Sequence, residues 1–280
     1  MRILLTGKNG QVGSALLATL PALGDVAAVD RTQLDLANPD SIRDAVAEIQ
    51  PQIIVNAAAY TAVDQAEREE ALAMRVNGDG PAIMAEEAKR TGALLVHFST
   101  DYVFDGEKAS PYLETDRPSP LNAYGRSKLA GERAIRASGC RYLIFRTSWV
   151  YAATGHNFLL TMLRLAREGK PLRVVDDQHG APTSSRMIAV ATAQAMRSLG
   201  KQDGIYHMSA AGSTTWYGFA RAIFRQAGLN PSLTPIASAD YPAPARRPRN
   251  SLLDNGLLVR HGIRLPAWEA GLSELLSAET

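Results

Sequence analysis

The chain has 280 residues, of which 46% are hydrophobic and 21% charged, and its formal net charge at pH 7 is +2. This composition is typical of soluble globular proteins, and the length suits one large domain with a smaller lobe attached. A net charge so close to zero gives little long-range attraction for nucleic acid or an anionic membrane. We therefore expect neither as a partner.

Cys140 is the only cysteine, which excludes an intramolecular disulfide and a thiolate metal cluster. The first apolar run begins at Arg2 and leads straight into a glycine-rich turn, which leaves no room for a cleavable signal sequence. No apolar stretch is long enough to span a bilayer. We therefore expect a cytoplasmic protein.

The first half of the chain alternates short apolar runs with longer amphipathic ones. The apolar runs predict strands at residues 2–6, 26–30, 53–57, 94–99 and 142–147, and the amphipathic runs predict helices at about 11–20, 40–49, 76–91 and 122–137. Nearly continuous apolar strands separated by helices are typical of a parallel sheet that is buried on both faces. Right-handed crossovers then make the fold class α/β, with a doubly wound parallel sheet of the Rossmann type.

After residue 147 the alternation is less regular. We predict helices at about 158–168, 186–199, 216–227 and 268–276, short strands near 172–175 and 205–208, and a proline-rich stretch at 231–248. This half reads as a smaller lobe that covers the carboxyl edge of the sheet. The sheet domain would take up residues 1–150 and the lobe mainly residues 151–280, with an approximate boundary and partly interleaved segments.

Three glycines lie between the first predicted strand and the first predicted helix, the context that a dinucleotide-binding turn requires. Gly7 would permit the tight turn, Gly10 would let a diphosphate approach the backbone, and Gly13 would allow close packing of the helix. Their Gly-x-x-Gly-x-x-Gly spacing favours the form of this loop found in short-chain dehydrogenases. The alternative is a glycine-rich turn without a ligand.

Small side chains at Ala57, Ala58 and Ala59 follow the third predicted strand. They would let the backbone approach a diphosphate and a nicotinamide ribose, or simply form a tight strand-to-helix junction. Together with the glycine turn they predict that residues 1–150 bind a dinucleotide and that the smaller lobe binds the substrate.

Neighbouring residues after the second predicted strand bear on which dinucleotide is bound. Asp30 could accept hydrogen bonds from the adenosine ribose of NAD, whereas Arg31 could bind the 2′-phosphate of NADP. We therefore expect use of both NADPH and NADH, and the preferred one stays open. Asp35 and Leu36 resemble a pair that flanks adenine in related enzymes, or they belong to the cap of the next helix.

Tyr124 and Lys128 lie one helical turn apart and share a face of the helix. The ammonium would lower the pKa of the phenol and hold a cofactor hydroxyl, which suits Tyr124 to proton transfer to a carbonyl oxygen. Thr100, at the end of the fourth predicted strand, could donate a second hydrogen bond to the same oxygen, although such residues also form turns. With the glycine turn, this predicts a nicotinamide-dependent oxidoreductase.

The histidines do not form a metal-binding set. His97 lies within an apolar strand, His156 and His179 lie in loops, and His207 alternates in a strand. None stands three or four residues from another, so we expect ordinary structural roles and no metal.

These motifs resemble those of the dTDP-4-dehydrorhamnose reductase family, within the extended short-chain dehydrogenases, and the similarity runs through almost the whole chain. The segments that carry it are GKNGQVG at 7–13, NAA at 56–58, STDYVF at 99–104, PLNAYG at 120–125, RTSWVY at 146–151, DQHGAPT at 177–183 and PARRP at 244–248. The last three lie in or beside the substrate lobe, and generic dehydrogenases lack them.

The resemblance implies NAD(P)H-dependent reduction of the 4-keto group of dTDP-4-dehydro-β-L-rhamnose to dTDP-L-rhamnose, the last step of dTDP-rhamnose synthesis. Thr100, Tyr124 and Lys128 would be the catalytic set, with hydride delivered to C4 and a proton from Tyr124 to the alkoxide. Asp101, Trp149 and Asn157 would line the sugar pocket. Cofactor contacts would come from Gly10, Gln11, Val12, Asp30, Asp35, Leu36, Ala57, Ala58, Ala59, Tyr124 and Lys128.

One departure from the family concerns assembly. Some relatives are dimers bridged by a metal ion through acidic residues, one of them on the first helix. The predicted helix at 11–20 contains no acid and has Ala15 at that place. We therefore expect no bridging metal, and a monomer rather than a metal-bridged dimer. Arg246 and Arg247 could bind the diphosphate or hold the two lobes together, and both roles stay open.

Competing functions make different demands on these residues. A non-catalytic regulatory protein of the same fold would be expected to lose the tyrosine, the lysine or the glycine turn, and all are intact. The related 4,6-dehydratases carry an Asp-Glu pair after the strand-end threonine, whereas here Asp101 is followed by Tyr102. Another nucleotide-sugar reductase stays open, because the residues do not reveal the nucleotide base.

Overall fold

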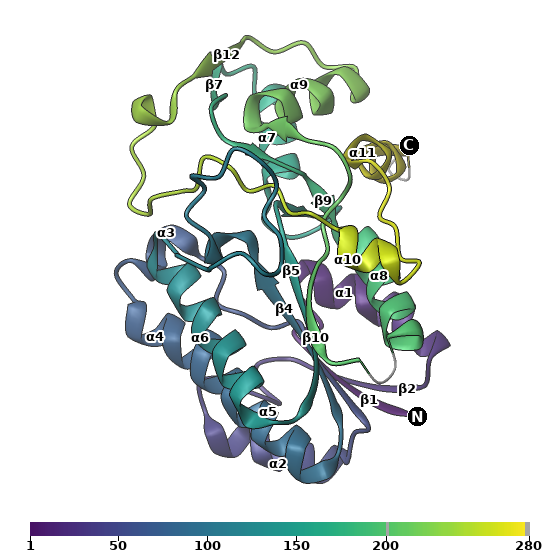
Figure 1. The fold of residues 1–280 in the computed structure, drawn as a ribbon. Coiled ribbons are helices and arrows are strands. Elements are labelled where there is room, and N and C mark those ends of the chain that lie inside the picture. Colours follow the sequence, from purple (N-terminus) through teal and green to yellow (C-terminus); the bar gives the residue numbers. More distant parts are fainter. Residues whose placement is uncertain (200–201, 278–280) are drawn as a thin grey trace.

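The computed structural model describes residues 1–199 and 202–277, and its centre is a six-stranded sheet (Figure 1). The strand order is β10-β5-β4-β3-β1-β2, and every pairing is parallel. The strands are β1 (Arg2–Thr6), β2 (Asp25–Val29), β3 (Ile53–Asn56), β4 (Leu94–Thr100), β5 (Arg141–Thr147) and β10 (Gly204–His207). The predicted doubly wound α/β fold is confirmed.

Helices cover both faces of the sheet. On one face lie α1 (Gln11–Thr19) and α8 (Ser185–Ser198), and on the other lie α2 (Pro39–Ile49), α5 (Gly80–Thr91) and α6 (Ala123–Ser138). Because side chains alternate along a strand, Leu5 packs in the first core and Leu4 in the second. Both are fully buried, which explains why these strands are apolar along their length.

The helix predicted at 76–91 is part of a longer helical stretch. Two short helices, α3 (Val63–Ala66) and α4 (Glu70–Met74), and a π-helical turn η2 (Arg75–Asp79) precede α5. In this turn Asn77 holds the backbone of Tyr60 through two hydrogen bonds, of 2.8 and 2.9 Å, and donates to Ser127 Oγ at 3.0 Å. The turn therefore ties the segment after β3 to α6.

The smaller lobe consists of short strand pairs and helices above the carboxyl edge of the sheet (Figure 1). β6 pairs with β9, β7 with β12, and β8 with β11. Their bounds and those of the helices are β6 (Val150–Tyr151), α7 (Phe158–Arg167), β7 (Leu172–Val175), β8 (His179–Gly180), β9 (Thr183–Ser184), β11 (Thr214–Thr215), α9 (Trp216–Gln226), β12 (Leu233–Ile236), α10 (Gly256–Arg260) and α11 (Trp268–Ser277). Short 3₁₀ turns are η1 (Leu20–Ala22), η3 (Asp101–Val103) and η4 (Ser238–Asp240).

The chain returns from this lobe to the sheet. The strand predicted near 205–208 is β10, which pairs with β5 at the edge of the main sheet, and α8 before it packs against α1. Both elements lie beyond residue 151. The two parts of the chain are therefore interleaved through these two elements.

The strand order places a ligand-binding crevice. β2 lies on one side of β1 and β3 on the other, so the connections diverge at the carboxyl ends of β1 and β3. Open α/β sheets bind ligands at such a point. The glycine turn follows β1, and Ala57, Ala58 and Ala59 follow β3, so the two predicted dinucleotide-binding segments meet there.

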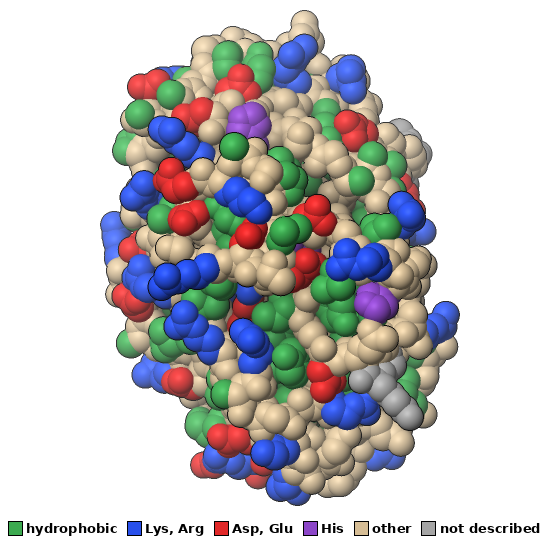
Figure 2. All heavy atoms as spheres, viewed as in Figure 1, with side chains coloured by type: hydrophobic (Ala, Val, Ile, Leu, Met, Phe, Trp, Pro, Cys, Tyr) green, Lys and Arg blue, Asp and Glu red, His purple; other side chains and the backbone are tan. Residues whose placement is uncertain are grey.

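The surface carries charges of both signs, interspersed over the face seen in Figure 2. Within residues 1–199 and 202–277, helices that combine the length and the apolar character needed to cross a membrane are absent.

Candidate active site

The glycine turn is fixed by close backbone contacts. Gly7 has φ +69°, and a Cβ there would lie 2.8 Å from the Ala58 nitrogen. A Cβ at Gly13 would lie 2.0 Å from the Gly7 carbonyl oxygen. Gly10 is the N-cap residue of α1 and provides no side-chain cap, so the amides of the first turn are free to face an anion. Gly7 and Gly13 therefore admit only glycine, and Gly10, which has no side chain, leaves the backbone of the turn open to a diphosphate.

An ionic cluster lies at the end of β2. It includes Lys8, for which the sequence predicted no role. Lys8 Nζ lies 3.2 Å from Asp30 Oδ2 and 2.8 Å from Gln33 Oε1. Thr32 donates to Asp30 Oδ1 from its amide and its hydroxyl, at 3.0 and 2.6 Å. The hydrogen bonds from Thr32 and Lys8 lower the pKa of Asp30 to about 2. Asp30 is therefore a carboxylate with a cation beside it.

The other residues considered for the adenosine end lie in different surroundings. Arg31 Nε is 3.6 Å from Asp35 Oδ1, and the Arg31 side chain is 76% exposed. Leu36 is buried in the core against the start of α5, where a Cβ at Gly80 would meet its carbonyl oxygen at 2.7 Å. Arg31 is thus free to move towards a ligand, whereas Leu36 is fixed.

Thr100 and Tyr124 come together at the carboxyl edge of β4. Thr100 ends the strand and is buried, and Tyr124 lies in the first turn of α6, which Asn122 caps by accepting from the Gly125 amide at 2.8 Å. Burial and the nearby Asp101 carboxylate raise the pKa of Tyr124, and a hydrogen bond with Thr100 opposes them. The expectation that Lys128 would lower this pKa is wrong for this structure, because burial raises it and Lys128 is not among the groups that shift it.

Lys128 is buried, and its amino group is held against β4. It is 2% exposed, and Nζ lies 2.6 Å from the Phe98 carbonyl oxygen and 3.2 Å from His97 Nε2. Burial lowers the pKa of Lys128 to about 8, and Glu132 acts in the opposite direction. His97, for which the sequence predicted only an ordinary structural role, is therefore a direct neighbour of the proposed catalytic lysine.

Asp101 directly follows Thr100 and lies beside the proposed catalytic residues. It is 4% exposed and accepts a hydrogen bond from Thr100 Oγ1 at 3.0 Å. Burial raises the pKa of Asp101 to about 6, although hydrogen bonds from Ser251 and Thr100 favour its charged form. Ser251 comes from the chain segment after η4, so residues from both the lobe and the sheet surround this carboxyl group.

Trp149 has a strained backbone and one covered face. Its φ is +49°, and its ring stacks on Trp216 with the centroids 3.6 Å apart and the planes at 8°. Gly180 lies against its edge, where a Cβ would be 2.3 Å from Cε2. The indole of Trp216 donates to Gln178 Oε1 at 3.2 Å. Trp216 therefore supports the ring of Trp149, which is predicted to contact the sugar. The sequence contained no signal for this role of Trp216.

We predict that Trp149→Ala raises KM for the sugar nucleotide at least about tenfold and leaves KM for NADPH within about twofold, because an indole packs on the apolar face of a deoxysugar. The thermal midpoint should fall by only a few degrees, because the side chain is half-buried. Steady-state kinetics measure the two KM values, and thermal unfolding measures the midpoint. Trp216→Phe, a change in the stacking partner of Trp149, is the control. A collapsed midpoint with both KM values unchanged would make Trp149 a packing residue.

Asn157 connects the lobe to the glycine turn. Its Oδ1 accepts from the Leu160 amide at 3.1 Å and so caps α7. Its Nδ2 donates to Gln11 Oε1 at 3.0 Å and to the Ala152 carbonyl oxygen at 2.9 Å. Gln11 begins α1, and Val12 beside it packs against the first core. Asn157 is therefore placed beside the predicted cofactor contacts as well as in the lobe.

A proline- and arginine-rich strap, residues 241–249, crosses from the lobe to the sheet domain. Arg247 forms two hydrogen bonds with Asp64, of 2.8 and 3.1 Å, and Asn122 Nδ2 donates to the Arg246 carbonyl oxygen at 2.8 Å. The guanidinium of Arg247 is thus engaged in holding the strap. Arg246 is mostly exposed and lies 3.7 Å from Glu107.

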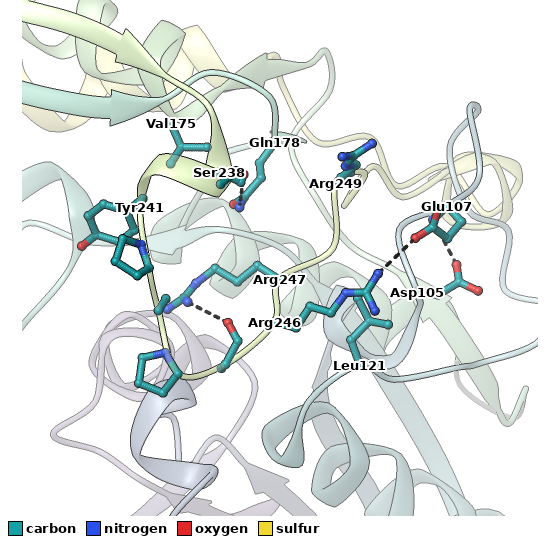
Figure 3. Close-up of a pocket in the computed structure, with 15 residues that line it drawn as sticks. Asp105, Glu107, Leu121, Val175, Gln178, Ser238, Tyr241, Arg246, Arg247 and Arg249 are labelled. Atoms are coloured by element: carbon teal, nitrogen blue, oxygen red, sulfur yellow. Dashed lines mark hydrogen bonds and ion pairs between the residues drawn. The ribbon is translucent and has the colours of Figure 1, made fainter.

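The strap borders a pocket of about 640 Å³ (Figure 3). Arg246 and Arg249 line it, together with Gln178 and Ser238 from the lobe. Tyr124 and Lys128 do not line it, so it lies beside the proposed reacting groups and not over them. The lining combines arginines with the carboxylates of Asp105 and Glu107, and the arginines suit the anionic part of a ligand.

Among the residues that the structure describes, groups of three or more His, Cys, Asp or Glu side chains arranged to hold a metal ion are absent.

The fold and the site define the class. A glycine turn at the switch point of a doubly wound sheet, with a tyrosine and a lysine one turn apart beside a strand-end threonine, is the arrangement of an extended short-chain dehydrogenase/reductase. The family model described as RmlD substrate binding domain matches residues 1–280. The chain belongs to this family, which confirms the resemblance found in the sequence.

Relatives and solved structures agree with this family. The chain is 49% identical to the dTDP-4-dehydrorhamnose reductase of Burkholderia thailandensis, over 96% of this chain and 95% of that one. It is 45% identical to the Escherichia coli K12 protein of the same name, over 99% and 97%. The crystal structure of the Bacillus anthracis dTDP-4-dehydrorhamnose reductase in complex with NADP superimposes with a TM-score of 0.95, at 39% identity, and covers 100% of this chain and 99% of that one.

Proposed function

We propose that the protein reduces the 4-keto group of dTDP-4-dehydro-β-L-rhamnose with NADPH or NADH and so forms dTDP-L-rhamnose. The observation that carries this proposal is the partly buried Tyr124, which lies in the first turn of α6 beside the strand-end Thr100 at the carboxyl edge of β4. It occurs in a chain that matches reductases of this name over nearly its whole length.

The residues at the crevice fit a dinucleotide. Gly7 and Gly13 leave no room for side chains between the first turn of α1 and the segment after β3, and the free amides of that turn suit a diphosphate. Gly10, Gln11 and Val12 would supply these amides. Asp30 and Lys8 stand at the end of β2, where the adenosine ribose would lie.

The proposed catalytic set then has distinct roles. The reduced nicotinamide would supply the hydride that C4 of the sugar accepts. Tyr124 donates its phenolic proton to the developing alkoxide, and Thr100 donates a second hydrogen bond to the same oxygen. Lys128 Nζ donates to the Phe98 carbonyl oxygen and lies 3.2 Å from His97 Nε2, and a further N–H would bind a ribose hydroxyl. Burial of Thr100 and Lys128 excludes water that would compete as a proton donor.

The decisive experiment is to follow the oxidation of NADH and of NADPH side by side, with the 4-keto-6-deoxy sugar nucleotide formed in situ. Product analysis should show a 4-hydroxy sugar nucleotide in amounts equal to the cofactor consumed. Reactions without the sugar nucleotide are the control. Consumption of neither cofactor would refute the proposal.

Cofactor choice should depend on opposing charges at the end of β2. Asp30 accepts hydrogen bonds from a ribose diol and repels a 2′-phosphate, whereas Lys8 and Arg31 attract the phosphate. We predict that wild type uses both cofactors, that Asp30→Ala shifts the kcat/KM ratio towards NADPH, and that Arg31→Ala shifts it towards NADH. Lys8→Met should shift it towards NADH by about tenfold, the size of a lost charge-assisted hydrogen bond.

The matched control is Lys170→Met, because Lys170 pairs with Glu168 in the smaller lobe. Its ratio should equal that of wild type. If Lys8→Met and Lys170→Met behave alike, Lys8 does not reach the 2′ position.

The proposals for cellular location and oligomeric state are those made from the sequence. The only cysteine, Cys140, is buried, and a chain without disulfides suits the cytoplasm. α1 contains no acidic residue, with Ala15 partly buried against the first core. We therefore retain the proposal of a monomer over a metal-bridged dimer.

A further inference from the structure

Three polar side chains stand in a row across neighbouring strands of the buried sheet. Thr6 of β1 is in register with Asn56 of β3, and Asn56 is in register with His97 of β4. Each is only 1% exposed. The Thr6 hydroxyl donates to Asn56 Oδ1 at 2.8 Å, and Asn56 Nδ2 lies 3.1 Å from His97 Nδ1. We call these residues the polar row.

Both ends of the polar row reach the proposed active site. At one end His97 Nε2 lies 3.2 Å from Lys128 Nζ. At the other end the Ala58 amide donates to Thr6 Oγ1 at 3.3 Å, in the turn that Gly7 contacts most closely. A continuous chain of hydrogen bonds therefore links the lysine to the dinucleotide turn.

The polar row can match either charge state of Lys128. Burial and the adjacent Lys128 lower the pKa of His97 well below its ordinary value, so the imidazole is neutral. With Asn56 donating to Nδ1, the imidazole proton lies on Nε2 and can be donated only to an uncharged amine. If the Asn56 amide turns over, its oxygen accepts from Nδ1–H, and Nε2 can accept from an ammonium.

Of the other groups around Lys128, the Glu132 carboxylate is already engaged. Glu132, one turn further along α6, binds Arg146 of β5 through both carboxylate oxygens. Tyr124 lies one turn earlier, and Asp101 follows the end of β4. From the η2 and α5 side, Asn77 reaches α6 as an uncharged amide. His97 is therefore the neighbour whose own proton can move between two positions in response to the lysine.

We propose that His97 is a positioning residue, which holds Lys128 in place and exchanges its tautomer, through the Asn56 amide, when the lysine gains or loses its proton. The catalytic consequence of this inference rests on the proposed reductase function. The tautomer exchange is a property of the protein alone and does not depend on that function.

The tautomer can be measured by long-range ¹H–¹⁵N NMR of the full chain between pH 6 and 10, with the His97 signals assigned from His97→Gln. We expect the proton to be on Nδ1 at low pH and on Nε2 at high pH, with a midpoint near 8, where burial places the pKa of Lys128. In Lys128→Met the tautomer should not change with pH. A wild-type tautomer that stays fixed across the range would overturn the inference, whether or not the enzyme is active.

Kinetics test the consequence for the reaction. In His97→Leu the ammonium loses an acceptor, so the pKa of Lys128 falls and the charged form is lost at lower pH. We expect kcat at pH 8 to fall about tenfold relative to wild type, and the deficit to shrink towards pH 6. His97→Gln, whose amide oxygen can accept from Lys128, should restore most of the activity at pH 8.

The matched control is His207→Gln, because His207 is a second fully buried histidine of the same sheet, on β10. Its pH profile should have the wild-type shape. A His97→Leu profile that is parallel to that of wild type at every pH would overturn the inference and leave the reductase proposal standing. An inactive wild type would refute the reductase proposal instead, and the NMR titration would then decide the inference.

Discussion

Tyr124→Phe should lower kcat by about 10²-fold or more, the usual contribution of a positioned general acid. The substitution removes the phenolic proton and keeps the ring, so the affinity for NADPH should change little. Steady-state turnover at saturating substrate and a fluorescence titration with NADPH measure the two effects separately.

Tyr102→Phe is the control for this prediction. The Tyr102 ring packs edge-on against that of Tyr124, with the centroids 5.9 Å apart, so loss of its hydroxyl tests for general damage to the same place. It should keep kcat within a few-fold of wild type. Near-full turnover in Tyr124→Phe would mean that another group supplies the proton.

Glu132→Leu should lower the stability more than other single changes proposed here. Glu132 and Arg146 are 1% and 2% exposed, and Ser99 also donates to the carboxylate at 2.5 Å. Removing the carboxylate leaves a buried guanidinium unpaired, at a cost of about 3–5 kcal/mol. Thermal unfolding should show a midpoint lower by about 6–15 °C.

Two further variants test whether the unpaired buried guanidinium causes the loss of stability. Glu70→Gln breaks an exposed pair with Arg126 and should change the free energy of unfolding by less than about 0.5 kcal/mol. The double variant Glu132→Leu/Arg146→Met should recover most of the lost stability, since no charge is left unpaired. If the double variant is no more stable than Glu132→Leu, the unpaired charge is not the cause.

Much of the fold could be predicted from the sequence because its signals are local. β1 to β5 lie within a residue or two of the predicted strands, since buried parallel strands are apolar along their length. The pairing of β10 with β5 could not be predicted, because its partner is chosen by the tertiary fold. The short helices α3 and α4 could not be predicted, because they lack side-chain caps and a clear apolar period.

In the candidate site, too, local features could be predicted from the sequence and contacts between distant segments could not. The glycine turn and the spacing of Tyr124 and Lys128 are local patterns, and the sequence predicted both. Lys8 and His97 act on residues of other strands and helices, and such contacts depend on register. Alternation along β4 places His97 on the same face as Ser99, towards α6, but only the assembled sheet brings Lys128 to its Nε2. The raised pKa of Tyr124 likewise comes from burial.

The return of the chain to the sheet limits how this protein could exchange parts with its relatives. β10 and α8 lie within the stretch that recombination at residue 151 would replace, yet they close the edge of β5 and cover the face shared with α1. A crossover there would pair a foreign edge strand and a foreign core helix with the resident sheet. An exchange of sugar specificity that spares the sheet needs two segments, one before α8 and one after β10. Specificity in this architecture is therefore inherited as a discontinuous module, and contiguous shuffling would select first for compatible cores.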